Sequence, residues 1–412
     1  MGKSPWDLRN LGDCLTFISR GVAPKYVTKS SIAVLNQKSI RWGYIQSENL
    51  KFHDPNKPVK RDIFIQKGDI VINSTGDITI GRAYYFKNKW NNLFVDSHVT
   101  ILRLNHEILL PEFLIYLFPL PEYQKKIYGL VTGATGQLEF SRTNLQKLDV
   151  EVPPLPIQRK IAAILSAYDD LIENNTRRIR ILEEMAQAIY REWFVHFRYP
   201  GYEGVRMVES SMGLIPEGWE IASFSDLVEI DPPTQVDKEI EKPYIDMGGL
   251  SINSMVIQWD EWRVGINGSK FQNEDVLFPR ITPSVENGKG GFVQCLPKGM
   301  KGIGSTEFIV FRKKYFPSEY IYFLSRDDKF RENATKSMIG ASGRQRVQKD
   351  CFGNFYLPSP PPELLRKFTE FVLPIFRFIQ VLSEKYNNLR IQRDLLLPKL
   401  LSGEIVFDTN KS

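Results

Sequence analysis

Apolar residues recur at alternating steps of four and three along residues 157–197. A 3.5-residue period sustained over more than four repeats is typical of a coiled-coil helix, and at 1.5 Å per residue such a helix is about 60 Å long. Pro153, Pro154 and Pro156 precede the pattern, and proline suits the first turn of a helix. The seam positions are Ile161, Leu165, Tyr168, Ile172, Asn175, Ile179, Leu182, Ala186, Ile189 and Trp193.

A second seam repeats the first at a displacement of 207 residues, which takes Ile161 to Phe368. A stripe left in water would cost about 25 cal/mol per Å² of apolar area, so we expect the two helices to cover each other. The ten positions of the second seam are Phe368, Val372, Ile375, Ile379, Leu382, Tyr386, Leu389, Arg393, Leu396 and Leu400.

We expect the two helices to pair antiparallel in a pseudo-two-fold molecule, which brings residues 400–407 near residues 6–11. Asn175, a polar residue on the seam, would fix the register at some cost in stability. Pro374 lies within the second seam, where its counterpart in the first is Ala167. Because proline costs about 3 kcal/mol in a helix interior, the second helix is expected to kink at Pro374 or to begin after it.

The segments before the two helices also repeat, and both read mainly as short strands and turns. Residues 63–72, 81–86, 99–104 and the short helix 111–117 correspond to residues 273–278, 291–296, 308–312 and 317–324. Residues 20–60 and 230–270 show little similarity to each other. The predicted fold is α+β, with two similar mixed α/β domains separated by two long antiparallel coiled-coil helices. We place the first domain at 1–152, the first helix at 153–199, a linker at 200–217, the second domain at 218–358, and the second helix with its tail at 359–412.

Composition narrows the class of protein only slightly. The chain has 42% hydrophobic and 25% charged residues, and no apolar run approaches the 18 residues of a membrane-spanning helix. Cys14, Cys295 and Cys351 lie far apart, which suits a reducing cytoplasm and gives no metal-ligand spacing. A net charge of +6 permits a polyanionic partner without requiring one.

One stretch resembles a catalytic motif. Asp231-Pro232-Pro233-Thr234 follows an apolar run, as the Asp-Pro-Pro-aromatic motif of amino-methyltransferases does. The fourth residue is Thr234 rather than an aromatic one, and no glycine-rich turn for S-adenosylmethionine precedes it, so a turn after a strand is favoured. We predict no catalytic residue, no metal and no cofactor on this chain. A DNA adenine methyltransferase-like enzyme and a coiled-coil structural adaptor remain the alternatives.

The candidate DNA contacts lie in polar loops. Each domain carries a glycine turn, residues 133–136 and 340–343, which could cradle a phosphate, and the second turn runs into Arg344-Gln345-Arg346. Arginine and glutamine are the side chains that read guanine and adenine edges with two hydrogen bonds. The candidates are Lys25, Ser74, Thr75, Arg82, Gln137 and Arg142 in the first domain, and Arg280, Thr282, Asn287, Lys289, Arg344, Gln345 and Arg346 in the second.

Four stretches carry a family resemblance. Residues 153–165 (PPLPIQRKIAAIL) and 192–201 (EWFVHFRYPG) resemble the two ends of the central region of type I restriction–modification specificity subunits. Residues 215–219 (IPEGW) are similar to the opening of that family's second recognition domain, and residues 393–405 (RDLLLPKLLSGEI) to its C-terminal region. This chain departs from the first copy of its own pattern at Leu365, where the first copy has Gln158.

The resemblance implies a non-catalytic, sequence-specific DNA-binding subunit of a cytoplasmic complex. Each target-recognition domain would read one half of a bipartite, asymmetric site in the major groove of double-stranded DNA. The helices would act as a spacer and dock two modification subunits, which carry S-adenosylmethionine and methylate adenine. Restriction subunits that translocate and cleave DNA would join this core.

Overall fold

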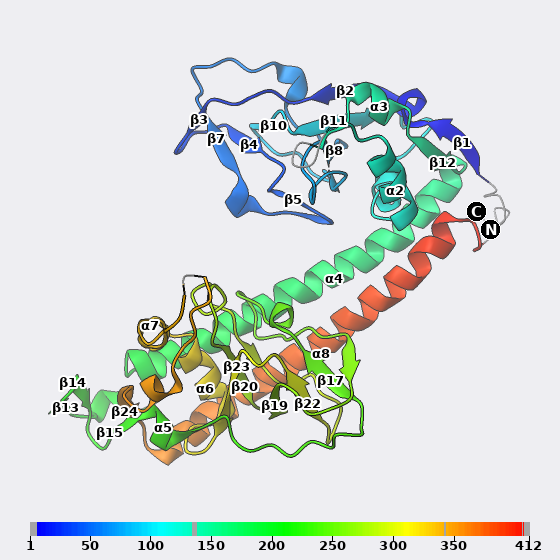
Figure 1. Cartoon of the computed structure of the whole chain (residues 1–412). Helices are drawn as coiled ribbons and strands as arrows, with labels where there is room; N and C mark the ends of the chain where they lie inside the picture. Colours follow the sequence, from blue (N-terminus) through cyan, green and yellow to red (C-terminus); the bar gives the residue numbers. More distant parts are fainter. Residues whose placement is uncertain (1–5, 134–137, 342, 406, 408–412) are drawn as a thin grey trace. The chain divides into compact units, whose positions relative to one another are not determined.

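The computed structural model describes residues 6–133, 138–341, 343–405 and 407. Contacts divide the chain into two compact units (Figure 1). Unit 1 holds Met1–Asp170 with Leu389–Ser412, and unit 2 holds Leu171–Asn388. Each long helix therefore contributes one part to each unit.

Unit 1 contains the strands and short helices that precede the first long helix. Before the long helix these are β1 (Asp7–Asn10), η1 (Leu11–Cys14), β2 (Leu15–Arg20), β3 (Tyr26–Val27), β4 (Ala33–Leu35), β5 (Ile40–Arg41), β6 (Tyr44–Ile45), η2 (Ser47–Asn49), β7 (Lys51–His53), η3 (Arg61–Ile63), β8 (Ile70–Asn73), β9 (Ala83–Tyr85), β10 (Leu93–Val95), β11 (Val99–Leu104), α1 (Pro111–Leu117), α2 (Pro121–Gly129), α3 (Arg142–Gln146) and β12 (Asp149–Val152).

The first long helix, α4 (Leu155–Tyr190), continues into a π-helical turn, η4 (Arg191–Val195). The elements of unit 2 that follow are η5 (Tyr202–Gly204), β13 (Met207–Ser210), β14 (Gly213–Pro216), β15 (Glu220–Ser223), α5 (Phe224–Leu227), β16 (Val228–Ile230), β17 (Lys242–Ile245), η6 (Met247–Gly249), β18 (Glu261–Arg263), β19 (Ser269–Gln272), β20 (Val276–Pro279), β21 (Gly291–Phe292), β22 (Lys301–Gly304), β23 (Phe308–Lys313), α6 (Ser318–Ser325), α7 (Asp328–Lys336), η7 (Lys349–Phe352) and β24 (Tyr356–Ser359). The second long helix is α8 (Pro362–Leu401).

The two units share one strand plan, which confirms two similar mixed α/β domains. A four-stranded antiparallel sheet has the order β2-β11-β8-β9 in unit 1 and β16-β23-β20-β21 in unit 2. A second sheet in each unit contains one parallel pair, β4 with β10 and β17 with β22. A two-stranded sheet joins the start of each domain to the strand before the long helix, as β1 with β12 and β15 with β24.

A buried ion pair occupies the same place in both antiparallel sheets. Arg103 donates to Asp69 at 2.9 Å in unit 1, and Arg312 donates to Asp275 at 2.7 Å in unit 2. Each aspartate also accepts the backbone N–H of the residue three positions earlier, so its carboxylate is held from two sides. The Asp69 and Asp275 side chains are 2% and 1% exposed. Paired, hydrogen-bonded burial is the condition under which a charge is tolerated inside a protein.

Every one of the twenty predicted seam positions is buried or half-buried. Within unit 2, Arg178 lies over the Phe378 ring at 5.1 Å and Trp193 contacts Phe368 at 6.0 Å. Sequence number therefore rises along α4 as it falls along α8, and the helices are antiparallel there. Within unit 1, the Tyr168 hydroxyl donates to Gln392 at 3.4 Å, and Leu400 joins the core that contains Ile161.

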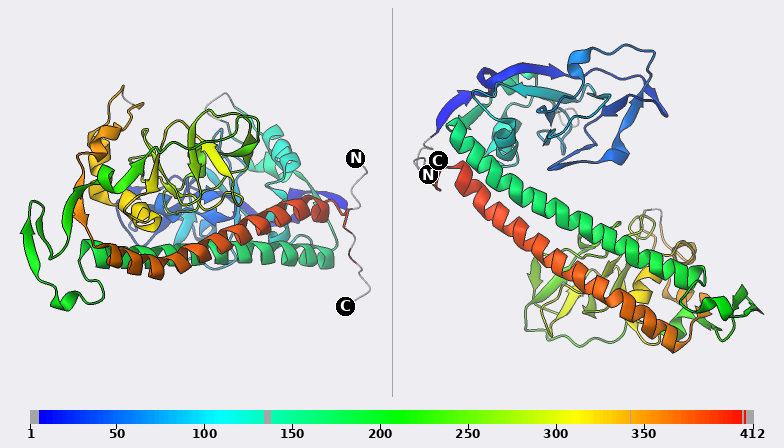
Figure 2. Two further views of the ribbon diagram at one scale, coloured as in Figure 1. Left: turned by 90° about the horizontal axis from the view of Figure 1, so that it is seen from below. Right: turned by 180° about the vertical axis from the view of Figure 1, so that it is seen from behind.

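The end of α8 reaches the start of the first domain, as predicted. The Trp6 indole N–H donates to the Leu401 carbonyl at 3.0 Å. Ile405 and Phe407 pack on the same core as Trp6, and residue 406 lies outside the described residues. Figures 1 and 2 show the ends of β1 and α8 close together within unit 1.

The expectation that α8 begins after Pro374 is wrong, because α8 starts at Pro362 and is helical without interruption to Leu401. Pro374 and Glu370 both lie on the exposed side of the helix. The Glu370 carbonyl, which loses its intrahelical donor to the proline ring, can therefore be hydrated. Val372 and Phe376 on either side are buried in the core of unit 2 and hold the helix in place.

The segment predicted as a linker contains a β-hairpin. Strands β13 and β14 pair antiparallel from Met207 with Pro216 to Ser210 with Gly213. Gly213 has a φ of +93°, a conformation that glycine adopts without the steric cost other residues meet. The Ser210 hydroxyl donates to the Gly213 carbonyl at 2.6 Å and closes the turn.

Candidate nucleic-acid interface

In unit 2 the structure brings four of the predicted loop residues together. The chain leaving β20 runs beside the segment that follows the second glycine turn. The Thr282 N–H donates to the Gln345 carbonyl at 3.1 Å, and the Val347 N–H donates to the Arg280 carbonyl at 2.8 Å. Residue 342 lies outside the described residues, so the glycine turn itself is described only in part. Arg280, Thr282, Gln345 and Arg346 therefore form one loop cluster on this unit.

Arg346 is already bound within this cluster. Its guanidinium donates to both oxygens of the Glu307 carboxylate, with the shortest contact at 2.7 Å. These hydrogen bonds raise the pKa of Arg346. Since the two-pronged edge of the guanidinium is occupied, Arg346 must leave Glu307 before it can read a guanine edge. Arg344, two residues earlier, is exposed.

The other candidates in unit 2 divide between half-buried and exposed positions. Arg280 donates through Nη2 to the Val347 carbonyl at 3.2 Å, and Lys289 donates to the Met247 carbonyl at 2.8 Å. Arg280 Nε and Thr282 Oγ1 are buried and have no hydrogen-bond partner in the part of the chain that the structure describes. Asn287 is exposed. Arg344 and Asn287 are thus the candidates whose side chains are fully open to a ligand.

The equivalent loop of unit 1 has the same backbone pairing but different side chains. Thr75 and Thr132 both form β-bridges with Glu139, as Ile281 and Ile339 both do with Arg346. Glu139 forms an ion pair with Arg20 at 3.0 Å. Positions 139 and 346, separated by the repeat displacement of 207, therefore carry opposite charges. The two loops present different electrostatic surfaces on one backbone scaffold.

Several residues in or beside these loops were not among the candidates predicted from the sequence. They are Arg20, Gln37, His98 and Glu139 in unit 1 and Glu307 in unit 2. The Thr75 hydroxyl contacts His98 Nδ1 at 2.9 Å and donates to Gln37 at 3.1 Å. Applying the displacement of 207 to Arg346 would have found Glu139. Nothing local in the sequence marks the other four, because their partners lie far away along the chain.

The remaining candidates of unit 1 are scattered. Ser74 is fully buried and its hydroxyl is hydrogen-bonded to the Thr100 hydroxyl, so in this structure it has no access to a ligand. Lys25 forms an ion pair with Asp54 at 3.2 Å, and Arg82 is half-buried. Arg142 is exposed at the first position of α3, whose N-cap is Ser141. Gln137 lies outside the described residues, as do residues 134–136 of the first glycine turn.

The methyltransferase-like stretch is a structural turn. Asp231 follows β16 with a φ of +47° and accepts the Val310 N–H at 2.7 Å. Its carboxylate also forms an ion pair with Lys349. Thr234 accepts a hydrogen bond from Arg312 at 2.9 Å, the arginine of the buried ion pair. The motif thus secures the end of a strand, and the catalytic interpretation is wrong.

Metal sites and membrane-spanning helices are two other features to consider in the described residues. No group of three or more histidine, cysteine, aspartate and glutamate side chains is placed to hold a metal ion there. No helix within the same residues combines the length and the apolar character needed to cross a bilayer. Cys14, Cys295 and Cys351 are free thiols.

Comparisons with known proteins agree with the duplicated architecture. Residues 4–184 match the family model of the type I restriction modification DNA specificity domain. The HindI specificity subunit of Haemophilus influenzae is 24% identical over 98% of this chain and 100% of its own length. The MjaIX specificity subunit of Methanocaldococcus jannaschii is 25% identical over 71% of this chain and 69% of its own. The crystal structure of a type I S subunit from M. genitalium has the same fold, with a TM-score of 0.58, 15% identity and 97% coverage of both chains.

Residues 4–184 of this chain carry the type I restriction modification DNA specificity domain, and relatives named as type I specificity subunits match most of its length. These matches support a DNA-recognition subunit of such a system rather than a catalytic one. The methyltransferase-like and adaptor alternatives are both set aside.

Proposed function

We propose that units 1 and 2 each read one half of a bipartite, asymmetric DNA site. The observation that carries this proposal is the shared strand plan with opposite charges at its equivalent loop positions, Glu139 and Arg346. One scaffold used twice provides two recognition surfaces, and different side chains on the loops give them different targets.

The partners in this proposal are double-stranded DNA, two modification subunits and restriction subunits. S-adenosylmethionine would be carried by the modification subunits, and the long helices would dock these subunits and set the spacing between half-sites. A cytoplasmic location is part of the proposal, and the three free thiols agree with it.

The experiment is methylome mapping in a host that lacks its own adenine methylation. Cells that express this chain with its modification subunit should methylate adenines in one two-part sequence with a fixed spacer. Cells that express either protein alone should not. Methylation at one continuous sequence, or methylation without this chain, would contradict the proposal. Retardation of DNA carrying the mapped site by the reconstituted complex separates DNA recognition from a purely structural role.

A further inference from the structure

The repeat displacement of 207 pairs Glu112 in α1 with Glu319 in α6, and Tyr85 in β9 with Phe292 in β21. Strand register supports the second assignment, since Tyr85 pairs with Ile70 and Phe292 with Val276, the residues that follow the equivalent aspartates Asp69 and Asp275. The correspondence of residues 81–86 with 291–296 expected from the sequence is therefore wrong in its register. In unit 1 the Tyr85 hydroxyl donates to the Glu112 carboxylate. Phe292 has no hydroxyl, so Glu319 loses this donor. Glu319 is nevertheless 6% exposed.

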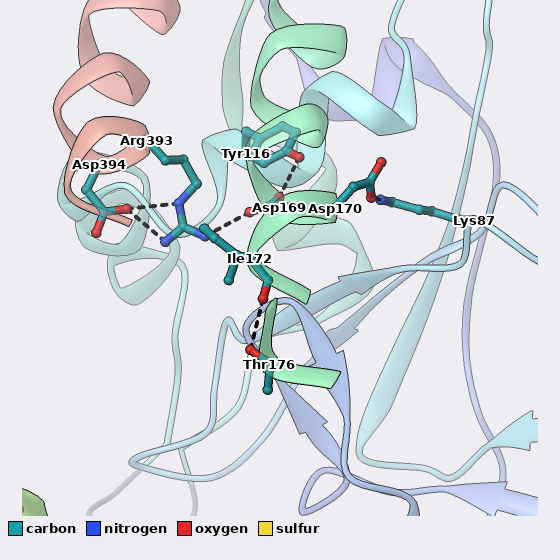
Figure 3. Close-up of polar contacts among 8 residues, drawn as sticks. All are labelled: Lys87, Tyr116, Asp169, Asp170, Ile172, Thr176, Arg393 and Asp394. Carbon is teal, nitrogen blue, oxygen red and sulfur yellow. Dashed lines mark hydrogen bonds and ion pairs between the residues drawn. The ribbon is translucent and has the colours of Figure 1, made fainter. Parts of the chain in front are cut away.

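A second polar contact of unit 1 is also changed. Figure 3 shows Lys87 beside Asp170, with an ion pair of 2.9 Å. The equivalent residues of unit 2 are Gln294 and Arg377, so an oppositely charged pair has become a neutral amide and a cation. Gln294 Nε2 is buried and has no hydrogen-bond partner within the described residues.

The neighbouring polar residues of unit 1 become apolar in unit 2. Figure 3 shows the Tyr116 hydroxyl directed at Asp169, which also accepts from Arg393. The equivalent residues are Phe323, Phe376 and Ala186, all buried, with the two phenylalanine rings 5.7 Å apart. The polar changes at Gln294 and Arg377 therefore lie beside an apolar wall.

These changes surround a cavity of about 310 Å³ in unit 2. Gln294, Ser318 and Arg377 line it, together with the rings of Phe292 and Phe376. Ser318 is 3% exposed and its hydroxyl has no hydrogen-bond partner in the described part of the chain. Ser318 is also the first residue of α6, and a helix N-terminus favours negative charge. Two donors without a partner, Gln294 Nε2 and the Ser318 hydroxyl, thus line this cavity beside the Arg377 side chain.

We propose that this cavity binds a carboxylate group, which accepts hydrogen bonds from Gln294 Nε2, the Ser318 hydroxyl and the Arg377 guanidinium. The carboxylate takes the part that Asp170 has in unit 1. An apolar stem on the ligand fits against Phe292 and Phe376. A small amphipathic carboxylate and an acidic side chain of a partner protein share this chemistry.

The acidic residues at the cavity are compatible with an incoming anion. Glu274 is already engaged in an ion pair with Lys313. Burial raises the pKa of Glu319, which favours its neutral carboxyl form. Arg377 and Lys313 act in the opposite direction on that pKa, which places both cations near the cavity.

The first arm of the test uses the isolated chain and benzoate, with neutral benzamide as the control ligand. Isothermal titration calorimetry should detect binding of benzoate and no binding of benzamide. The double variant Gln294→Lys/Arg377→Asp restores the polarity of unit 1 within the cavity and should weaken benzoate binding at least tenfold. Ser318→Ala should weaken it by a smaller factor. Lys385→Gln changes the net charge equally on an exposed position of α8 and should have no effect. Thermal melting verifies that each variant is folded.

The second arm measures the affinity of the chain for its modification subunit. Of the two arms, only this one rests on the proposed function. If benzoate does not bind, a tenfold loss of affinity in the double variant but not in Lys385→Gln assigns the carboxylate to a partner side chain. Absence of benzoate binding with unchanged subunit affinity overturns the inference. If the wild-type chain does not bind the subunit at all, the proposed function fails and the benzoate arm decides the inference by itself.

Discussion

Arg393 of α8 donates a hydrogen bond of 2.8 Å to Asp169 of α4, within unit 1 (Figure 3). Arg393 also binds the neighbouring Asp394, and Asp169 also accepts from Tyr116. Burial lowers the pKa of Arg393, but the hydrogen bonds to the two aspartates outweigh burial and raise it. A polar network thus occupies a seam position at which the first helix has Ala186.

The first prediction concerns this network. Arg393→Ala should lower the free energy of unfolding by about 1–2 kcal/mol, because Asp169 keeps its charge and loses its cation. The triple variant Tyr116→Phe/Asp169→Phe/Arg393→Ala copies unit 2 and should recover most of that loss, since a complete apolar replacement leaves no unpaired charge. Urea denaturation measures both. An Arg393→Ala variant as stable as wild type would show that the network contributes nothing.

The second prediction separates the two arginines of the unit 2 loop. Arg344→Ala should weaken discrimination at one half-site by about 1–3 kcal/mol if its side chain makes a two-pronged contact to a base. Arg346→Ala should have a smaller effect, because Glu307 already holds its guanidinium. Fluorescence anisotropy with single-base variants of the mapped site gives the values, and Lys385→Ala serves as the control. Equal effects at both half-sites would argue against base reading by Arg344.

The third prediction concerns pH and the Glu183 carboxylate of α4. It accepts hydrogen bonds from the Ser254 hydroxyl at 2.7 Å and the Met255 N–H at 2.8 Å. Burial nevertheless raises the pKa of Glu183 above its ordinary value of 4.5. The folded state therefore binds the proton more tightly than the unfolded state, and this contribution to stability is lost as the pH rises through the raised pKa.

Glu183→Gln removes this ionisation and keeps an oxygen acceptor. The free energy of unfolding of the variant minus that of wild type should be more positive at about pH 7.5 than at about pH 4. Denaturation of both proteins at the two pH values is the measurement. Glu184→Gln, on the exposed side of the same helix, is the matched control. A stability difference that does not change with pH would refute the prediction.

The fourth prediction tests the helices as a spacer. Deleting residues 172–178 with residues 379–385 removes one heptad from each helix and keeps both seams in phase. Each helix shortens by about 10.5 Å, which corresponds to about three base pairs of DNA at 3.4 Å per step. We expect unchanged half-site sequences with a shorter preferred spacer, and weaker binding from the accompanying rotation. Methylome mapping is the measurement. If the double deletion methylates sites with the parental spacer, the helices do not act as a spacer.

Local pattern was enough to define the large features of this protein. A 3.5-residue period places the apolar residues of a long helix on one stripe that faces a partner helix, so spacing alone predicted which positions of α4 and α8 are buried. The displacement of 207 residues between the two seams indicated the duplication. The expected break at Pro374 was based on the free-energy cost of proline in an isolated helix. In this protein, buried neighbours stabilise the helix and the freed carbonyl faces solvent.

The second sheet shows where residue similarity fails as a guide. Residues 20–60 and 230–270 look unrelated, yet β4 and β17 each have one parallel and one antiparallel neighbour in matching places. Strand pairing is made by backbone N–H and C=O groups that every residue except proline carries in full. The side chains can therefore diverge while the pairing is kept.

What the sequence by itself determined was the helical seams and the duplication, which depend on periodic or repeated residues, and the class of protein, which depends on the resemblance of four stretches to a known family. Only the tertiary structure decided that Ser74 is buried, that Arg346 is bound by Glu307, and that Gln294 and Ser318 line a cavity with polar atoms that have no hydrogen-bond partner among the described residues. Each of these depends on partners distant along the chain. Whether a polar side chain is satisfied, exposed or left with free hydrogen-bonding capacity is a property of those distant neighbours, and spacing along the sequence does not contain it.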